Sequence, residues 1–262
     1  MKIIFRFSII SVLFFSACTL SGGEVNIPAK AIKSPAGIYK YGVKTSKDGY
    51  YEEARKVFNI LRKKYPTSLY ATTAKLRIAD SYKKEEMYAT AASRYRIFRR
   101  DHPDHEGVNS GYVLYSIAWC NYKLGPGNFF LFPPAYEKDL SFMEVAHTLL
   151  KHFIRKYPKS TYLKKAKKLY RKTRKTLVDH ELYVARYYEK KEKYKAVKMR
   201  YEYLLNKYSD SKKVPEVSLK LSKVYLKLGK KEKAKKLLSA IIEKVKSPEV
   251  VKQANALRKS IN

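Results

Sequence analysis

Small, aromatic and aliphatic side chains recur at fixed intervals along most of this chain. A set of five positions appears twice with an offset of 37 residues, as Tyr51, Ala54, Phe58, Leu61 and Pro66 and then as Tyr88, Ala91, Tyr95, Phe98 and Pro103. Intervals of three and four residues place such side chains on one face of a helix, and the proline marks where that helix ends. Similar sets start at Met143, Tyr194 and Lys231. The pattern therefore predicts five related amphipathic helices.

A second helix precedes most of these helices. Twelve residues before the small anchor stands another small side chain in four of the copies, at Gly42, Ala79, Ala185 and Ser222. An aromatic or aliphatic residue comes just before each of them, and in three copies a tyrosine follows three positions later. This arrangement is typical of tetratricopeptide repeats, in which small side chains let two antiparallel helices approach closely. The sequence predicts an all-α tetratricopeptide-repeat superhelix of about five helix-turn-helix repeats.

Two connections between the repeats are longer than the others. The anchors of the second helices are separated by 37, 55, 51 and 37 residues, at Ala54, Ala91, Ala146, Val197 and Ala234. The first long connection contains residues 125–134, an apolar loop that either plugs the adjoining repeat or forms a patch for a partner. The second contains residues 164–182, whose periodicity predicts one long helix that joins the third and fourth repeats.

The first residues have the features of a targeting signal. Two bases precede a short uncharged apolar run. This run is shorter than the roughly 20 apolar residues that a bilayer-spanning helix needs. The run ends at Phe15-Ser16-Ala17-Cys18, which resembles a bacterial lipobox. Residues 1–17 are therefore predicted to be a lipoprotein signal peptide and Cys18 to be lipidated, with ordinary secretion or a retained anchor as alternatives. Residues 18–35 are expected to form the lipidated N-terminus and a tether.

The chain carries little that is typical of an enzyme. Once Cys18 is modified, Cys120 is the remaining cysteine, and its apolar neighbours predict a buried side chain instead of a nucleophile. His102 and His105 lie on either side of a proline, without a cluster of further ligands, which favours a loop over a metal site. Phosphate-binding loops and nucleophile elbows are missing from the sequence. We expect no catalytic residue, no cofactor and no metal.

The chain is strongly basic, with 57 Lys and Arg residues against 23 Asp and Glu residues and a formal net charge of +34. Its densest basic run contains no acid and comprises Lys164, Lys165, Lys167, Lys168, Arg171, Lys172, Arg174 and Lys175. Apolar residues repeat between them at helical spacing, so these bases should cover the outer face of a helix. That face is either simply solvated or docks an acidic domain or anionic lipid headgroups. Nucleic acid is disfavoured, because an exported lipoprotein seldom meets it.

Several segments, taken in order along the chain, resemble the BamD family. That family is the lipoprotein component of the machine that assembles β-barrels in the outer membrane. The similar segments are the lipobox, Gly49-Tyr50-Tyr51-Glu52-Glu53-Ala54, Lys64-Tyr65-Pro66-Thr67-Ser68, Arg155-Lys156-Tyr157-Pro158 and Glu181-Leu182-Tyr183-Val184-Ala185. The resemblance implies a lipid-anchored repeat protein on the periplasmic face of the outer membrane. It implies as partners a BamA-like barrel protein, other assembly-machine lipoproteins and unfolded outer-membrane proteins.

The resemblance also implies a division of labour between two sets of repeats. Residues 36–140 would receive the targeting segments of unfolded barrel proteins, and residues 141–262 would dock the periplasmic domains of BamA. Tyr65 and Arg200 match family positions associated with client contact, although an inter-repeat packing residue and a surface base are equally good readings of them. The alternative function is another cell-envelope adaptor, for example in division or peptidoglycan coordination. A third is an accessory domain of a wall-degrading enzyme.

Overall fold

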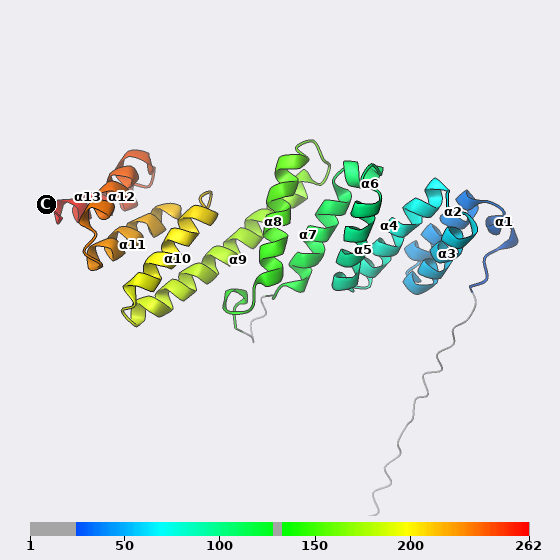
Figure 1. Cartoon of the computed structure of the whole chain (residues 1–262), viewed down its shortest axis with the longest axis horizontal. Helices are drawn as coiled ribbons and strands as arrows, with labels where there is room; N and C mark the ends of the chain where they lie inside the picture. Colours follow the sequence, from blue (N-terminus) through cyan, green and yellow to red (C-terminus); the bar gives the residue numbers. More distant parts are fainter. Residues whose placement is uncertain (1–24, 128–132, 262) are drawn as a thin grey trace, which may run out of the picture.

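The chain forms an elongated stack of paired helices (Figure 1). The computed structural model describes residues 25–127 and 133–261, and every regular element within these ranges is helical. The pairs are α2 (Pro35–Lys47) with α3 (Tyr51–Lys64), α4 (Leu69–Lys84) with α5 (Tyr88–Asp101), α7 (Tyr112–Leu124) with α8 (Ser141–Lys156), α9 (Leu163–Lys190) with α10 (Tyr194–Lys207), and α11 (Val214–Lys227) with α12 (Lys231–Lys244). The prediction of an all-α array of five tetratricopeptide repeats is confirmed. The predicted signal peptide and Cys18 lie outside the described residues.

Four shorter elements accompany the pairs. They are α1 (Ala29–Ile32), α6 (Glu106–Asn109), the 3-10 helix η1 (Ala135–Glu137) and the final helix α13 (Pro248–Lys259). Helix α13 packs against α11 and α12 and buries Ala254. It therefore covers an apolar surface that the last pair would otherwise expose, which is what a capping element does in a repeat protein.

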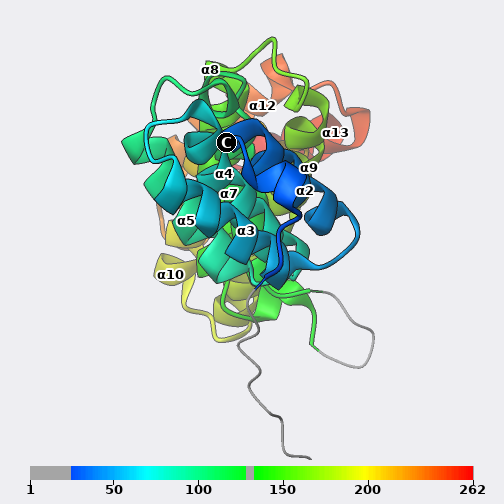
Figure 2. The same ribbon diagram turned by 90° about the vertical axis from the view of Figure 1, so that its right-hand side faces the viewer.

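The main helix–helix contacts within the described residues are between near neighbours along the array. Each first helix packs against the second helix of its own pair, and each second helix packs against the first helix of the next pair. The first helices also meet one another, α2 with α4 and α7 with α9. We call the side formed by α2, α4, α7, α9 and α11 the first-helix face. Viewed from the N-terminal end, successive pairs overlap in projection (Figure 2).

The two helices of each pair meet at two small residues, one on each helix, that are buried between them. On the first helices these are Gly42, Ala79, Ala118, Ala185 and Ser222, and on the second helices they are Ala54, Ala91, Ala146, Val197 and Ala234. A Cβ atom placed on Gly42 would lie 2.7 Å from Cε1 of Phe58, so a larger residue would displace that ring. Ala118 is the small residue on α7, the first helix of the third pair. The spacing of twelve residues did not identify it, because the long connection separates it from Ala146.

Four of the pairs use the same tight turn between their helices. It contains one residue in the left-handed conformation, and these residues are Gly49, Glu86, Glu192 and Gly229, with φ values of 93°, 62°, 53° and 70°. The next amide donates to the carbonyl five residues earlier, as from Met87 N to Tyr82 O at 2.9 Å. This is the long hydrogen bond of a Schellman motif. The recurring tyrosines of the sequence pattern thus mark the last turn of the first helix.

A second recurring turn separates successive repeats. Tyr65, His102, Tyr157 and Tyr208 directly follow the second helices, and their φ values lie between −122° and −135°. In three of these turns the next residue is proline, which disfavours the helical conformation in the residue before it. Tyr208 is followed by Ser209 and adopts the same conformation. The prolines therefore reinforce a turn that the packing of neighbouring repeats also stabilises.

The two long connections have different structures. The predicted long helix is confirmed, since α9 runs for 28 residues and serves as the first helix of the fourth repeat. The apolar loop lies partly outside the described residues, at 128–132. Its described end packs on α9, where Tyr136 O lies 2.6 Å from Nδ1 of His180 and the Tyr136 ring lies 5.8 Å from the ring of Tyr183. This end of the connection therefore covers α9.

The turn at Glu192 provides a test of the repeat geometry. A residue with a Cβ atom pays about 1–2 kcal/mol in the left-handed conformation, and glycine does not, although glycine loses more entropy on folding. We expect Glu192→Gly to raise the free energy of unfolding by about 0.5–1 kcal/mol, measured by urea denaturation. Glu192→Ala, which removes the same carboxylate but keeps the Cβ atom, should give no such gain. Equal stability of the two variants would contradict the assigned turn.

Candidate partner-binding surfaces

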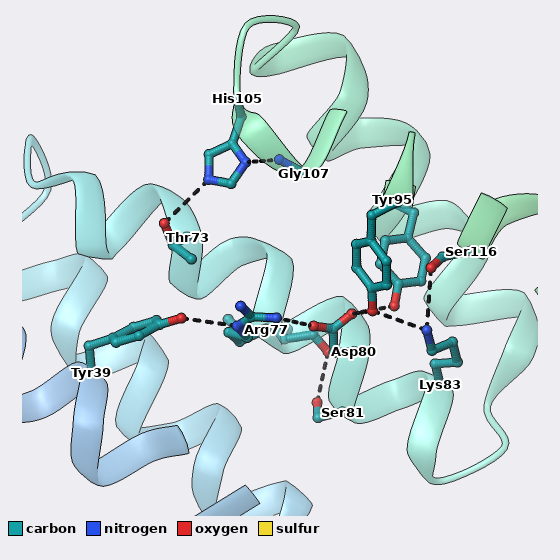
Figure 3. A network of polar contacts seen from close by, with 12 residues as sticks. Tyr39, Thr73, Arg77, Asp80, Ser81, Lys83, Tyr95, His105, Gly107 and Ser116 are labelled. Atoms are coloured by element: carbon teal, nitrogen blue, oxygen red, sulfur yellow. Dashed lines mark hydrogen bonds and ion pairs between the residues drawn. The ribbon is translucent and has the colours of Figure 1, made fainter. Parts of the chain in front are cut away.

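A network of polar side chains crosses the first three repeats (Figure 3). Its centre is Asp80 of α4. One carboxylate oxygen of Asp80 accepts hydrogen bonds from the hydroxyls of Tyr95 and Tyr112, both at 2.5 Å. The other carboxylate oxygen lies 2.9 Å from Nη1 of Arg77, which also donates through Nε to the hydroxyl of Tyr39 at 3.0 Å. A single carboxylate thus connects α2, α4, α5 and α7.

The protonation states of this network are fixed by its surroundings. Burial, together with the charge of Asp80, raises the pKa values of Tyr95 and Tyr112. Both phenols therefore remain protonated at neutral pH and act as donors toward the carboxylate. Because the partly buried carboxylate of Asp80, 19% exposed, accepts hydrogen bonds from side chains on neighbouring helices, the network restricts how the first three repeats can move relative to one another.

A cluster of cations and aromatic rings lies next to this network. Nζ of Lys83 is 3.1 Å from the Tyr112 hydroxyl and 5.9 Å from the Trp119 ring centroid, and burial lowers the pKa of Lys83. On the other side, Nζ of Lys123 is 5.6 Å from the Trp119 ring and 5.4 Å from the Tyr88 ring. We call Lys83, Tyr88, Trp119 and Lys123 the aromatic–cationic cluster. Such a surface can hold apolar side chains and a carboxylate of an extended segment.

Tyr65 lies at the N-terminal end of the array. It follows α3 directly, and its half-buried ring packs against the apolar cluster of the first repeat. Its hydroxyl is 3.5 Å from Lys33 O, and Nζ of Lys64 is 5.8 Å from its ring centroid. The side chain therefore contributes to packing and still presents part of its ring to solvent.

Arg200 lies in the other half of the array, on α10. Its Nη1 is 3.4 Å from Oε2 of Glu181, a carboxylate on α9 that is only 7% exposed. The Arg200 side chain itself is 42% exposed. Arg200 thus compensates a buried charge between two helices while keeping donors available at the surface. Figure 1 shows α3 and α10 well apart, so Tyr65 and Arg200 do not form one site.

The basic run lies on α9, with its apolar residues turned inward. Ala166, Thr173 and Leu177 are buried, whereas seven of the eight predicted bases are exposed. Arg174 differs, because it is 14% exposed and forms an ion pair with Asp210. Three bases have partners within the protein: Arg174, Lys175 opposite Asp179 at 2.7 Å, and Lys172 at 5.1 Å from the Tyr122 ring. Within the described residues, Lys164, Lys165, Lys167, Lys168 and Arg171 form no ion pair.

Comparison with known proteins identifies the family of this chain. Residues 32–239 match YfiO, a family described as an outer membrane lipoprotein. The chain belongs to the YfiO family. It is 28% identical over 184 residues to the outer membrane protein assembly factor BamD of Neisseria meningitidis, covering 70% of this chain and 69% of the relative. It is 31% identical over 166 residues to the factor of that name from Buchnera aphidicola, covering 62% of this chain and 66% of the relative.

The family resemblance stated from the sequence is thus confirmed. A further relative, the outer membrane protein assembly factor BamD of Pasteurella multocida, is 25% identical over 243 residues, covering 91% of this chain and 89% of the relative. The match to the YfiO family includes most of the five helix pairs and ends in α12. Across the described residues, no helix combines the length and the apolarity needed to cross a membrane.

The two histidines and the cysteine considered in the sequence analysis pack within the helical array. His105 accepts a hydrogen bond from Gly107 N at 3.0 Å through Nδ1, and Nε2 of His102 lies 3.0 Å from Nζ of Lys75. Both rings lie about 5 Å from the ring of Phe98. Cys120 is buried, as predicted, and burial raises the pKa of its thiol to about 11. Within the described ranges, His, Cys, Asp and Glu side chains form no group of three or more that could hold a metal ion.

His147 lies buried beneath the basic run and is 4% exposed. Its ring stacks on Tyr170 with centroids 4.5 Å apart, and its Nδ1 is 3.1 Å from the hydroxyl of Thr173. Burial is the main cause that lowers the pKa of His147 from 6.5 to about 4. The imidazole is therefore neutral at pH 7 and packs as an aromatic ring between α8 and α9.

The central role of Asp80 can be tested by Asp80→Asn. The substitution removes the charge opposite Arg77 and weakens two phenol hydrogen bonds, so we expect the free energy of unfolding to fall by about 2–4 kcal/mol. Tyr39→Phe, at the edge of the network, removes one hydrogen bond to Arg77 and should cost about 1 kcal/mol. Urea denaturation followed by circular dichroism measures both. A loss for Asp80→Asn no larger than that for Tyr39→Phe would show that Asp80 does not organise the network.

The lowered pKa of His147 predicts how the free energy of unfolding depends on pH. Between pH 6.5 and pH 4 the unfolded chain protonates this histidine and the folded protein does not, so stability falls as the pH is lowered through this window. We expect the loss due to His147 to be on the order of 2–3 kcal/mol. His147→Gln keeps a polar side chain that does not titrate and should lose less stability between pH 7 and pH 4.5 in urea denaturation. Parallel pH profiles for the two proteins would refute this assignment.

Proposed function

We propose that this chain is a non-enzymatic, lipid-anchored scaffold that takes part in the assembly of β-barrel proteins in the outer membrane. The observation that carries this proposal is the match of residues 32–239 to the YfiO family. The relatives named above are outer membrane protein assembly factors. A stack of helix pairs supports such a role physically, because it presents extended surfaces on which several partners can bind at once.

The proposed anchor is the lipid on Cys18. Cleavage after residue 17 would remove the signal peptide, and residues 18–35 would connect the lipid to the first helix pair. The lipobox and the description of the family as an outer membrane lipoprotein support this arrangement. It would hold the repeats at the periplasmic face of the outer membrane. A permanent protein span is not needed for this attachment, because lipid chains bury their own apolar surface in the bilayer.

The proposed client-binding half comprises residues 36–140. Its first-helix face carries Lys83, Trp119 and Lys123 of the aromatic–cationic cluster, and the fourth member, Tyr88, begins α5. Tyr65 lies at the N-terminal end of this half. Exposed ring surface and fixed cations suit an unfolded outer-membrane protein segment that presents apolar side chains and a carboxylate. The network around Asp80 would keep this surface ordered before a client arrives, which lowers the entropy cost of binding.

The proposed scaffold half comprises residues 141–262. It would dock the periplasmic domains of a BamA-like barrel protein and contact other assembly-machine lipoproteins. The boundary at residue 140 falls between α7 and α8, which pack against each other. The two halves are therefore parts of one continuous array, so a partner held on one half has a fixed position relative to a client on the other.

Co-purification tests the proposed function. The chain, carrying an affinity tag at its C-terminus, is recovered from gently solubilised envelopes of its own organism. We expect a BamA-like barrel protein and other lipoproteins to be recovered with it. Cys18→Ser should lose membrane association and acylation while keeping the helical circular dichroism spectrum. Recovery of division or peptidoglycan-synthesis proteins without any barrel protein would favour the alternative envelope adaptor and refute the assembly role.

A test of whether Arg200 contacts clients requires a variant that preserves its ion pair with Glu181. Arg200→Ala would leave the buried carboxylate of Glu181 without its cation, so a loss of client binding could reflect a change in folding. Arg200→Lys keeps a positive charge there but removes the planar guanidinium. If Arg200 contacts clients, crosslinking of an unfolded barrel protein to the Lys variant should be weaker at unchanged stability. Unchanged crosslinking would remove Arg200 from the client site.

A further inference from the structure

A basic hollow lies between α9, the turn before α11, and α11 itself. Two neighbouring pockets, with volumes of about 280 and 330 Å³, share Asp179 and Lys213 and together form it. Five of the eight residues that line the first pocket are bases, and the second pocket adds Arg186 and Lys220. The carboxylates in the lining are Asp179 and Glu216. Positive charge therefore dominates the walls of the hollow.

One wall of the hollow is held in place by Asp210. This carboxylate, in the turn between α10 and α11, forms an ion pair with Arg174 and lies 3.2 Å from the hydroxyl of Tyr170. Both partners belong to α9, so the turn is fixed against that helix. As a result Lys212 faces the same pocket as Arg171. The N-terminus of α11 begins directly after this turn and adds partial positive charge.

Some of the lining bases have no carboxylate of their own. Lys175 lies 2.7 Å from Asp179, while Glu216 is shared by Lys213 at 2.9 Å and Lys220 at 3.3 Å. By contrast, three bases form no ion pair with any described residue, and these are Arg171, Arg186 and Lys212. They occur in both pockets and so leave excess positive charge along the whole hollow.

We infer that this hollow binds an extended acidic segment of another protein, with an apolar side chain between its carboxylates. Arg171 and Arg186 are fifteen residues apart on one helix, which corresponds to about 22 Å. An extended chain covers this distance with about seven residues. Val178 and Leu182 line the hollow between the two arginines and offer apolar contacts for side chains near the middle of the segment. Carboxylates on either side of it would then pair with Arg171, Lys212 and Arg186.

The shape of the site favours a polypeptide over a membrane surface. A bilayer presents its headgroups as a broad, nearly flat layer, whereas these bases line the walls of a recess. Asp179 and Glu216 in the same walls would repel a continuous sheet of phosphates. A single extended chain can place its carboxylates beside the unpaired bases and avoid the two acids. This inference does not rest on the docking of a barrel protein or on the identity of any client.

Isothermal titration calorimetry with a synthetic peptide tests the inference. The probe is a capped peptide of sequence Glu-Glu-Leu-Glu-Leu-Glu-Glu, titrated into the full mature chain at about 0.15 M salt. Arg171→Gln with Lys212→Gln removes two bases that leave no carboxylate unpaired, and we expect peptide affinity to fall about tenfold or more. Lys164→Gln with Lys165→Gln makes the same change in charge on α9 outside the pockets and should change affinity less than about twofold.

Three results would overturn the inference. The first is the absence of measurable peptide binding. The second is an equal loss of affinity in both double variants, which would show that binding depends on the net positive charge of the protein and not on the hollow. The third comes from co-sedimentation with vesicles that contain phosphatidylglycerol. If the pocket variant loses vesicle binding while its peptide affinity is unchanged, the hollow is a headgroup site. Retention of the helical circular dichroism spectrum in both variants excludes unfolding as the cause.

Discussion

The close approach of two helices at a pair of compact side chains is the constraint on which the rest of the structure depends. A residue such as Gly42 or Ala185 allows the facing helix to come near enough for large rings to fill the space on either side. Each pair then buries its remaining apolar face only against the neighbouring pairs. The result is a long surface rather than a single enclosed core. That geometry suits a protein whose proposed work is to hold several partners in fixed relation.

Carboxylates are scarce in this basic chain, and several of them connect different helices. Asp80 joins four helices of the first three repeats, Asp210 fixes the turn before α11 to α9, and Glu181 pairs with Arg200 across α9 and α10. Acids used in this way order the bases around them. The remaining bases, on the surface, are not neutralised and generate a positive field over the array. The same shortage of acids therefore sets both how repeats are joined and which partners the surface attracts.

Much of the fold follows from local sequence patterns, and the features that these patterns did not predict have identifiable physical causes. Helical spacing with small anchors predicted the repeats and the single long helix α9, because these features depend on residues close in sequence. The first helix of the third repeat did not follow from the spacing, since an inserted connection separates Ala118 from its partner Ala146. The capping role of α13 was also missed, because it departs from the repeat pattern and is defined by the surface that it covers. The network around Asp80 joins polar side chains up to 38 positions apart, and the repeat pattern does not specify which polar groups meet between helices.

The sequence by itself determined the class of fold, the number of repeats, the burial of Cys120 and the family, since each depends on residue order or on periodicity within a single helix. It also determined that the bases of α9 face outward. Only the tertiary structure decided which of those bases are engaged, because Arg174 meets Asp210 through a turn 36 residues away. It likewise kept Tyr65 and Arg200 apart in space and brought Lys212 to the same pocket as Arg171. Such pairings depend on how successive helices stack, and stacking is set by contacts between repeats that no single segment encodes.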